Sequence, residues 1–155
     1  MPAESAAGVE SESGRALPEE LKKIVTEAGE EEWGNDVWER IDGVLPGVCN
    51  DAYALDWARE NLESEDTDLR DLAASLFEAS SLELSDQDIL GLETLMKEDE
   101  DFPGFRAACA LAKRLGVDRR IEFLRGGIED KLKAFADDQD VADIVAEYIE
   151  LLKEN

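Results

Sequence analysis

The sequence predicts an all-α fold made of stacked helical hairpins, and three observations support this prediction. Residues 69–74 can be laid over residues 105–110 at an offset of 36, and each copy has a large apolar residue, an arginine and then a cluster of small residues. Each copy is followed by a second apolar pattern at helical spacing, and these second patterns superpose at an offset of 32. Strand-like alternation and Asn-Gly turn pairs are scarce, so a sheet has almost no support. A repeated helix pair is typical of architectures in which neighbouring units bury each other's apolar faces.

The N-terminal part is predicted to be a tail followed by a first helix. Residues 1–16 are rich in Ala, Ser, Gly and Glu without apolar periodicity, so we expect a disordered acidic tail. The first helix is expected over about 18–31. Pro18 suits a first turn, and Glu19 and Glu20 complement the positive end of the helix dipole.

Four helices that form two hairpins are expected next. Asn35 or Asp36 caps a helix that should stop at residues 43–47, around Pro46. Asn50 or Asp51 caps the helix that follows, and these two form the first hairpin. In the second hairpin, Asp66 caps one helix, and Ser85 with Asp88 resembles a capping box that opens the other.

The C-terminal part is expected to hold a third hairpin and a final helix. Asp101 and Pro103 begin a helix that Gly116 should end in a left-handed cap. A short second helix through Ile121, Phe123 and Leu124 should then end at Gly126-Gly127. A strongly amphipathic helix around residues 141–152 is expected to cap the stack. The prediction is thus about eight or nine helices, with residues 17–155 forming a single domain large enough for a core.

The charge of the chain is strongly negative and unevenly distributed. Forty acidic and 16 basic residues give a net charge of −24, which disfavours direct binding to nucleic acid or to anionic lipid. Residues 1–105 carry a net charge of −22 and residues 134–155 carry −6, whereas residues 106–133 carry +4. Only this middle segment is basic.

Two interpretations of the basic segment stay open. Its cations include Lys113, Arg114, Arg119, Arg120 and Arg125. In the favoured interpretation they lie near helix C-termini and pair with neighbouring acids. In the other, an arginine patch docks an acidic partner or a second copy of the chain.

The repeat pattern resembles HEAT-like repeats, most clearly over residues 66–125. Arg70 and Arg106 match the arginine near the start of the family's first helix, and small residues stand where helices approach closely: Ala73, Ala74, Cys109 and Ala110. The turn has Asp101-Phe102-Pro103 in place of the usual Asp-Pro. The resemblance implies a right-handed superhelix of antiparallel hairpins that is used mainly for protein binding, and it carries over no catalytic residue.

No catalytic, cofactor or metal site is predicted. The chain has no histidine, which removes the commonest general base and metal ligand. The motif Asp86-x-Asp88-x-Leu90-Gly91 lacks the fifth and twelfth ligands of a calcium loop. Cys49 and Cys109 lack metal-ligand spacing and are expected to be cytosolic thiols.

Candidate partner-binding residues come from the aromatic and acidic residues. Trp33 lies in a turn and is the best candidate for an exposed aromatic anchor, whereas Trp38 and Trp57 have core spacing. An acidic face is expected to steer a basic protein partner to it. The full set of candidates is Trp33, Asp56, Glu60, Glu63, Asp86, Glu93, Arg119, Arg120 and Arg125.

The function that these features predict is a non-catalytic scaffold or adaptor for a basic protein. The alternatives are a nucleic-acid mimic, an adaptation of the surface charge to high salt, and an enzyme similar to HEAT-like lyases, which the missing histidine disfavours. A cytoplasmic location is expected, since no signal peptide or membrane span is seen, and a monomer is favoured.

Overall fold

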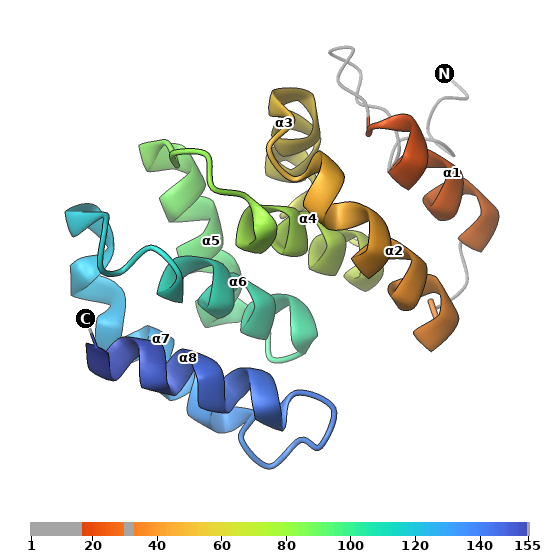
Figure 1. Cartoon of the computed structure of the whole chain (residues 1–155). Coiled ribbons are helices and arrows are strands. Elements are labelled where there is room, and N and C mark those ends of the chain that lie inside the picture. The colour runs from red at the N-terminus through yellow and green to blue at the C-terminus, as the bar shows by residue number, and fades with distance from the viewer. Residues whose placement is uncertain (1–16, 30–32, 155) are drawn as a thin grey trace. The chain divides into compact units, whose positions relative to one another are not determined.

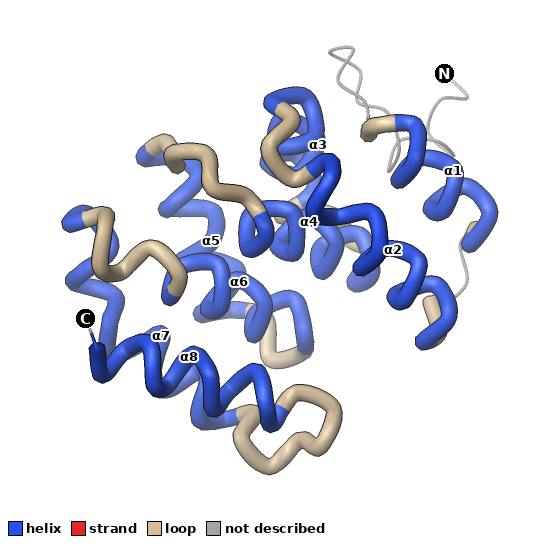
Figure 2. Tube along the Cα trace, in the orientation of Figure 1, coloured by secondary structure: helices blue, strands red, loops and turns tan. Residues whose placement is uncertain are grey.

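The computed structural model describes residues 17–29 and 33–154, and within these ranges the regular structure is entirely helical (Figures 1 and 2). The all-α prediction is confirmed. The predicted tail, residues 1–16, lies outside the described residues. The chain divides into two compact units after Glu83, whereas the sequence predicts a single domain over residues 17–155.

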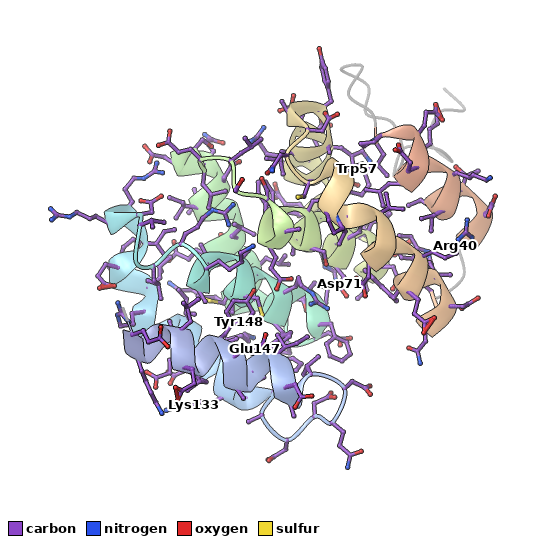
Figure 3. All side chains as sticks on the ribbon, viewed as in Figure 1. Arg40, Trp57, Asp71, Lys133, Glu147 and Tyr148 are labelled. Carbon is purple, nitrogen blue, oxygen red and sulfur yellow. The ribbon has the colours of Figure 1, made fainter. Side chains whose placement is uncertain are left out.

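Unit 1 contains four helices that pack as two pairs. The helices are α1 (Glu19–Ala28), α2 (Asn35–Val48), α3 (Ala52–Asn61) and α4 (Thr67–Ala79). Helix α1 packs against α2, and α3 packs against α4, while α2 also touches α4. Arg40 of α2 pairs with Glu27 of α1 at 2.9 Å (Figure 3). The predicted first hairpin, which joined α2 to α3, is therefore wrong, because α3 packs mainly on the helix that follows it.

The ends of the unit 1 helices differ from the sequence predictions. Helix α1 ends before residue 31, because Gly29 has a φ of 71°, a left-handed value that favours glycine. Helix α2 does not stop around Pro46 but continues to Val48. Pro46 falls in the last turn, where a missing N–H removes one helix bond, and the burial of Leu45 and Val48 outweighs that loss.

The core of unit 1 is built around a fully buried Trp57 (Figure 3). The buried apolar side chains of the four helices follow the 3.6-residue periodicity. These buried side chains include Leu21, Ile24, Ile41, Leu45, Leu72, Leu76 and Phe77. Burial of each one removes apolar surface from water, which stabilises the unit by about 1.5–3 kcal/mol per large side chain.

Unit 2 is organised around one nearly completely buried helix. Its helices are α5 (Asp86–Glu98), α6 (Phe102–Ala112), the 3₁₀ helix η2 (Arg119–Leu124), α7 (Arg125–Ala134) and α8 (Ala142–Glu154). Helix α6 packs against α5, α7 and α8, and nine of its 11 residues are buried. Helix α5 also touches α7, and α7 lies beside α8 (Figure 1). Small residues on α6 allow these helices to approach closely.

Two glycine-based predictions for unit 2 are wrong. Gly126-Gly127 does not end a helix, because α7 begins at Arg125 and runs through both glycines. The burial of Ile128 and Leu132 holds this helix in place. Gly116 is not a left-handed cap, since Gly29 is the only glycine with positive φ in the described ranges. The predicted short helix through Ile121 and Leu124 is the 3₁₀ helix η2.

Candidate functional site

The candidate site is an open hollow of about 270 Å³ on unit 2, between the first half of α5 and η2. We call it the α5–η2 hollow. Its lining residues are Asp86, Ile89, Leu90, Glu93, Arg120 and Phe123. Three of them, Asp86, Glu93 and Arg120, were candidates on sequence grounds, and the fold brings these three together.

Two large apolar side chains at this hollow are unusually exposed. Leu90 is 60% exposed and Phe123 is 73% exposed. Single exposed apolar residues are ordinary on protein surfaces, but here two of them line one hollow. This pair is the part of the site that the sequence prediction missed.

Local chemistry explains how α5 presents its share of the hollow. A capping box fixes its start: the Ser85 hydroxyl accepts from the Asp88 N–H (3.1 Å), and the Asp88 carboxylate accepts from the Ser85 N–H (2.9 Å). From this start, positions 86, 90 and 93 fall on one face of the helix, while Leu92 and Met96 face the core.

The 3₁₀ geometry of η2 explains why Phe123 points outward. A 3₁₀ helix has three residues per turn, so Ile121 and Leu124 share one face. Both are buried, and Phe123 is therefore left on another side. The sequence predicts a short helix through these three residues and does not indicate which of them is exposed.

Arg120 forms the charged border of the hollow, and its guanidinium is held within unit 2. It donates to Asp86 (2.6 Å), to both carboxylate oxygens of Asp118 (3.0 and 2.8 Å) and to the Leu84 carbonyl (2.6 Å). These hydrogen bonds from Arg120 lower the pKa of Asp118, against the opposing effect of desolvation. The hydrogen bonds to Asp118 and Asp86 in turn raise the pKa of Arg120.

One carboxylate of the hollow, that of Asp86, is accessible to a cation from solvent. The Asp86 side chain is 87% exposed although it contacts Arg120, so a second cation can reach it. Glu93 lies deeper and pairs with Lys97 at 2.6 Å. The hollow therefore presents an exposed carboxylate beside two exposed apolar side chains.

The other cations of the basic segment bond mainly within unit 2. Arg125 donates to Glu122 and to the Leu152 carbonyl in the last turn of α8. Lys131 donates to the Asp99 carbonyl at the end of α5 (2.9 Å). Arg114 is buried and donates to the Ala110 carbonyl; its burial lowers its pKa. These contacts support the internal interpretation of the segment, while Arg119 is exposed.

The two arginines that carried the family resemblance have different surroundings. Arg70 donates to the Ser64 carbonyl (2.8 Å) and to the Thr67 hydroxyl (3.2 Å), so it holds the turn before α4. Arg106 lies over the Phe105 ring at 5.8 Å. The small residues near both arginines are fully buried: Ala73, Ala74, Cys109 and Ala110.

The remaining candidates lie on unit 1. Asp56 pairs with Arg59 at 2.6 Å, and Glu60 and Glu63 are exposed near the end of α3. They belong to a different unit from Asp86 and Glu93, so the expected acidic face is divided between the two units.

Trp33 is not exposed, so the expectation of an exposed aromatic anchor there is wrong. Its side chain is 6% exposed, and its ring lies 5.5 Å from that of Trp38. Its backbone N–H donates to Asp68 of α4 (3.0 Å), which draws the turn onto the unit 1 core. Trp38 is half-buried and Trp57 is fully buried.

The described residues contain no group of three or more His, Cys, Asp or Glu side chains that could hold a metal ion. Cys49 and Cys109 are buried free thiols. Within the same ranges, no helix has the length and apolar character needed to cross a membrane. Comparison of the chain with protein-family models, curated proteins and solved structures finds no match.

Proposed function

We propose that this chain is a non-catalytic, cytoplasmic protein-interaction module of HEAT-like type, and that its α5–η2 hollow binds a basic protein. The observation that carries the proposal is the pair of exposed apolar side chains, Leu90 and Phe123, beside the exposed Asp86 carboxylate. Such a pair supplies apolar anchors, and the carboxylate selects a partner with a cation nearby.

The apolar residues of the hollow supply most of the affinity in this proposal. Full burial of a leucine or phenylalanine is favourable by about 1.5–3 kcal/mol. Leu90 and Phe123 are already partly covered, so each contributes a fraction of that value when a partner covers it. An aromatic residue at the centre of an interface typically acts as a hot spot.

The charge of the chain supplies selectivity and speed. A net charge of −24 attracts basic proteins and repels acidic ones. The cations near the hollow do not fully cancel this preference, because three acids (Asp86, Asp118 and Glu93) stand against two cations (Arg120 and Lys97). Association is therefore expected to slow as salt increases.

The packing inside each unit supports the HEAT-like part of the proposal. The pairs α3–α4 and α5–α6 place Arg70 and Arg106 on second helices, whereas the resemblance has them on first helices. In unit 2, α5 touches α7 and α6 touches α8, so alternate helices meet. In unit 1, α2 and α4 meet in the same way. Stacked hairpins require this pattern.

The experiment is site-specific photo-crosslinking in the host cell, with a benzoyl-phenylalanine placed at Phe123 or, as a matched control, at Val117. Val117 is also on unit 2 and is 84% exposed, but it does not line the hollow. We expect one basic protein to crosslink at position 123, not at 117, and to be lost with Asp86→Lys. Equal crosslinking at both positions, or crosslinking unaffected by Asp86→Lys, contradicts the proposal. Loss of the crosslink when DNA is added to a cell lysate before irradiation indicates a nucleic-acid mimic instead.

A further inference from the structure

The 3₁₀ helix η2 is unusually long and runs directly into α7. It has six residues, whereas 3₁₀ runs longer than three or four residues are uncommon, because their hydrogen bonds are poorly aligned. Its last residue, Leu124, is followed at once by Arg125, the first residue of α7. Both residues have right-handed helical backbone angles, with φ of −93° and −50°. Residues 119–134 therefore form one uninterrupted helical run whose form changes at Arg125.

The sequence of this run fits a single α-helix. Four apolar residues lie three, four and four positions apart: Ile121, Leu124, Ile128 and Leu132. That spacing places all four on one face of an α-helix. All four are buried in the structure, where the first two also share a face of the 3₁₀ helix. The same apolar contacts are thus compatible with both helix forms, and burial alone does not decide between them.

Arg120 makes hydrogen bonds that only the 3₁₀ form allows. Its guanidinium donates to Asp86 at the start of α5, to the Leu84 carbonyl just before it and to Asp118. A 3₁₀ helix turns 120° per residue and an α-helix 100°, so the α form would rotate Arg120 by about 100° relative to α7. It would also shorten the six residues by about 3 Å. Both movements take the guanidinium away from the start of α5.

The geometry of these bonds makes them strong enough to select one helix form. Arg120 meets both carboxylate oxygens of Asp118 in a fork, and the Asp118 side chain is only 15% exposed. Forked, charge-assisted bonds of this kind are stronger than an isolated surface ion pair. The bond to Asp86, whose side chain is 87% exposed, is the accessible part of the set.

We propose that residues 119–124 are a two-state element, which Arg120 holds as a 3₁₀ helix against the start of α5 and which joins α7 as one α-helix when these bonds are lost. Arg120 and Phe123 both line the α5–η2 hollow, so the hollow keeps its shape only in the held form. The inference concerns the free chain and does not depend on the proposed partner.

The test is the pattern of proton–proton contacts in NMR spectra of the isotope-labelled full chain. In a 3₁₀ helix the Hα of residue i lies close to the amide proton of residue i+2, and in an α-helix it lies close to that of residue i+4. We expect i,i+2 contacts without i,i+4 contacts over residues 119–124 of the wild-type chain. Arg120→Ala should lose them and gain i,i+4 contacts from Ile121 to Arg125 and from Glu122 to Gly126.

Arg119→Ala is the matched control. It makes the same change of helix propensity at the neighbouring position of η2, where the side chain is exposed. The bonds to Asp86, Asp118 and the Leu84 carbonyl come from Arg120 and stay in place in this variant. Arg119→Ala should therefore keep the wild-type pattern, and an equal change in both variants overturns the inference, because propensity alone would then explain it.

Three further results overturn the inference. They are an α-helical pattern in the wild-type chain, a 3₁₀ pattern that survives Arg120→Ala, and loss of both patterns from residues 119–124 while the rest of unit 2 stays folded. If unit 2 as a whole fails to fold in Arg120→Ala, Asp86→Asn decides, since it changes an exposed residue of α5 and leaves residues 119–124 intact. Appearance of i,i+4 contacts beside the i,i+2 contacts then supports the two-state element, and an unchanged wild-type pattern overturns it.

Discussion

Several cations of the basic segment donate hydrogen bonds to backbone carbonyls of other elements. Arg120 bonds the Leu84 carbonyl, Lys131 the Asp99 carbonyl and Arg125 the Leu152 carbonyl. Asp99 and Leu152 lie at the C-terminal ends of α5 and α8, where the helix dipole favours a positive charge. These internal bonds account for part of the excess of arginine and lysine over residues 106–133.

The Asp118–Arg120 contact leads to a prediction about pH. The pKa of Asp118 is lowered below its ordinary value of about 3.9, mainly by the hydrogen bonds from Arg120. A lowered pKa in the folded state means that Asp118 stabilises unit 2 above about pH 4, and that this contribution is lost as the pH falls through the folded pKa. In an NMR titration of the carboxyl carbons, Arg120→Gln should return the Asp118 midpoint toward 3.9.

The neighbouring Arg119 provides the control for this titration. Arg119 is exposed, and the arginines that lower the pKa of Asp118 are Arg120 and Arg114. Arg119→Gln should therefore leave the Asp118 midpoint low. An equal rise in the two variants would show that general charge, and not the hydrogen bonds from Arg120, sets this pKa.

At the scale of elements, the sequence predicts where helices begin better than where they end. The caps Asp51, Asp66 and Ser85 act as expected, because a side chain that bonds the first N–H groups is a local feature. Helix α2 is an exception, since it begins after Gly34 without a side-chain cap. Where a helix ends and which helix it pairs with depend on which apolar faces meet in the folded chain. The residues around a helix end do not reveal this.

The candidate site was predictable only in its charged part. Asp86, Glu93 and Arg120 stand out in the sequence through their charge. The exposure of Leu90 and Phe123 depends on the rotation of α5 and on η2 being a 3₁₀ helix, which tertiary packing decides. Tertiary packing also decides the burial of Trp33, whose side chain joins the core of unit 1.

The close approach of α6 to α5 leads to a prediction about stability. A Cβ on Gly104 would overlap the Asp99 carbonyl and come within 3.2 Å of the Leu95 carbonyl oxygen. Because both obstacles are backbone, Gly104→Ala should destabilise the protein by about 1–3 kcal/mol, measured by urea unfolding. Gly126→Ala, with open space around it, should instead stabilise it by about 0.5–1 kcal/mol. A neutral Gly104→Ala would show that α5 and α6 are not packed this closely.

At the scale of the whole molecule, the charge is large in both units but unequal. Residues 1–83 contain 22 acidic and six basic residues, a net charge of −16, and residues 84–155 contain 18 and 10, a net charge of −8. Repulsion among these acids opposes the compact state. In unit 2, the bonds from Arg120, Arg125 and Lys131 to backbone carbonyls offset part of this repulsion.

The excess of acidic over basic residues predicts that salt stabilises the folded chain. Raising KCl from 0.05 to 1 M shortens the Debye length to about 3 Å, so repulsion among exposed acids weakens more than the close ion pairs do. The thermal midpoint should rise, by about 2–4 °C for each 1 kcal/mol gained. A midpoint that falls with KCl would mean that attractive pairs outweigh the repulsion. A rise that continues steeply into molar salt would favour adaptation to high salt as the reason for the acidity.

The central claim is that the α5–η2 hollow binds a basic protein, and calorimetry tests it most directly. The partner identified by crosslinking is titrated, as the free protein, against the wild-type chain, Phe123→Ser and Asp86→Asn at several KCl concentrations. The account predicts that Phe123→Ser weakens binding by roughly tenfold at every salt concentration, because it removes an apolar anchor. It also predicts that Asp86→Asn weakens binding mainly at low salt and flattens the salt dependence. Unchanged affinity in both variants would contradict the claim that the α5–η2 hollow is the binding site.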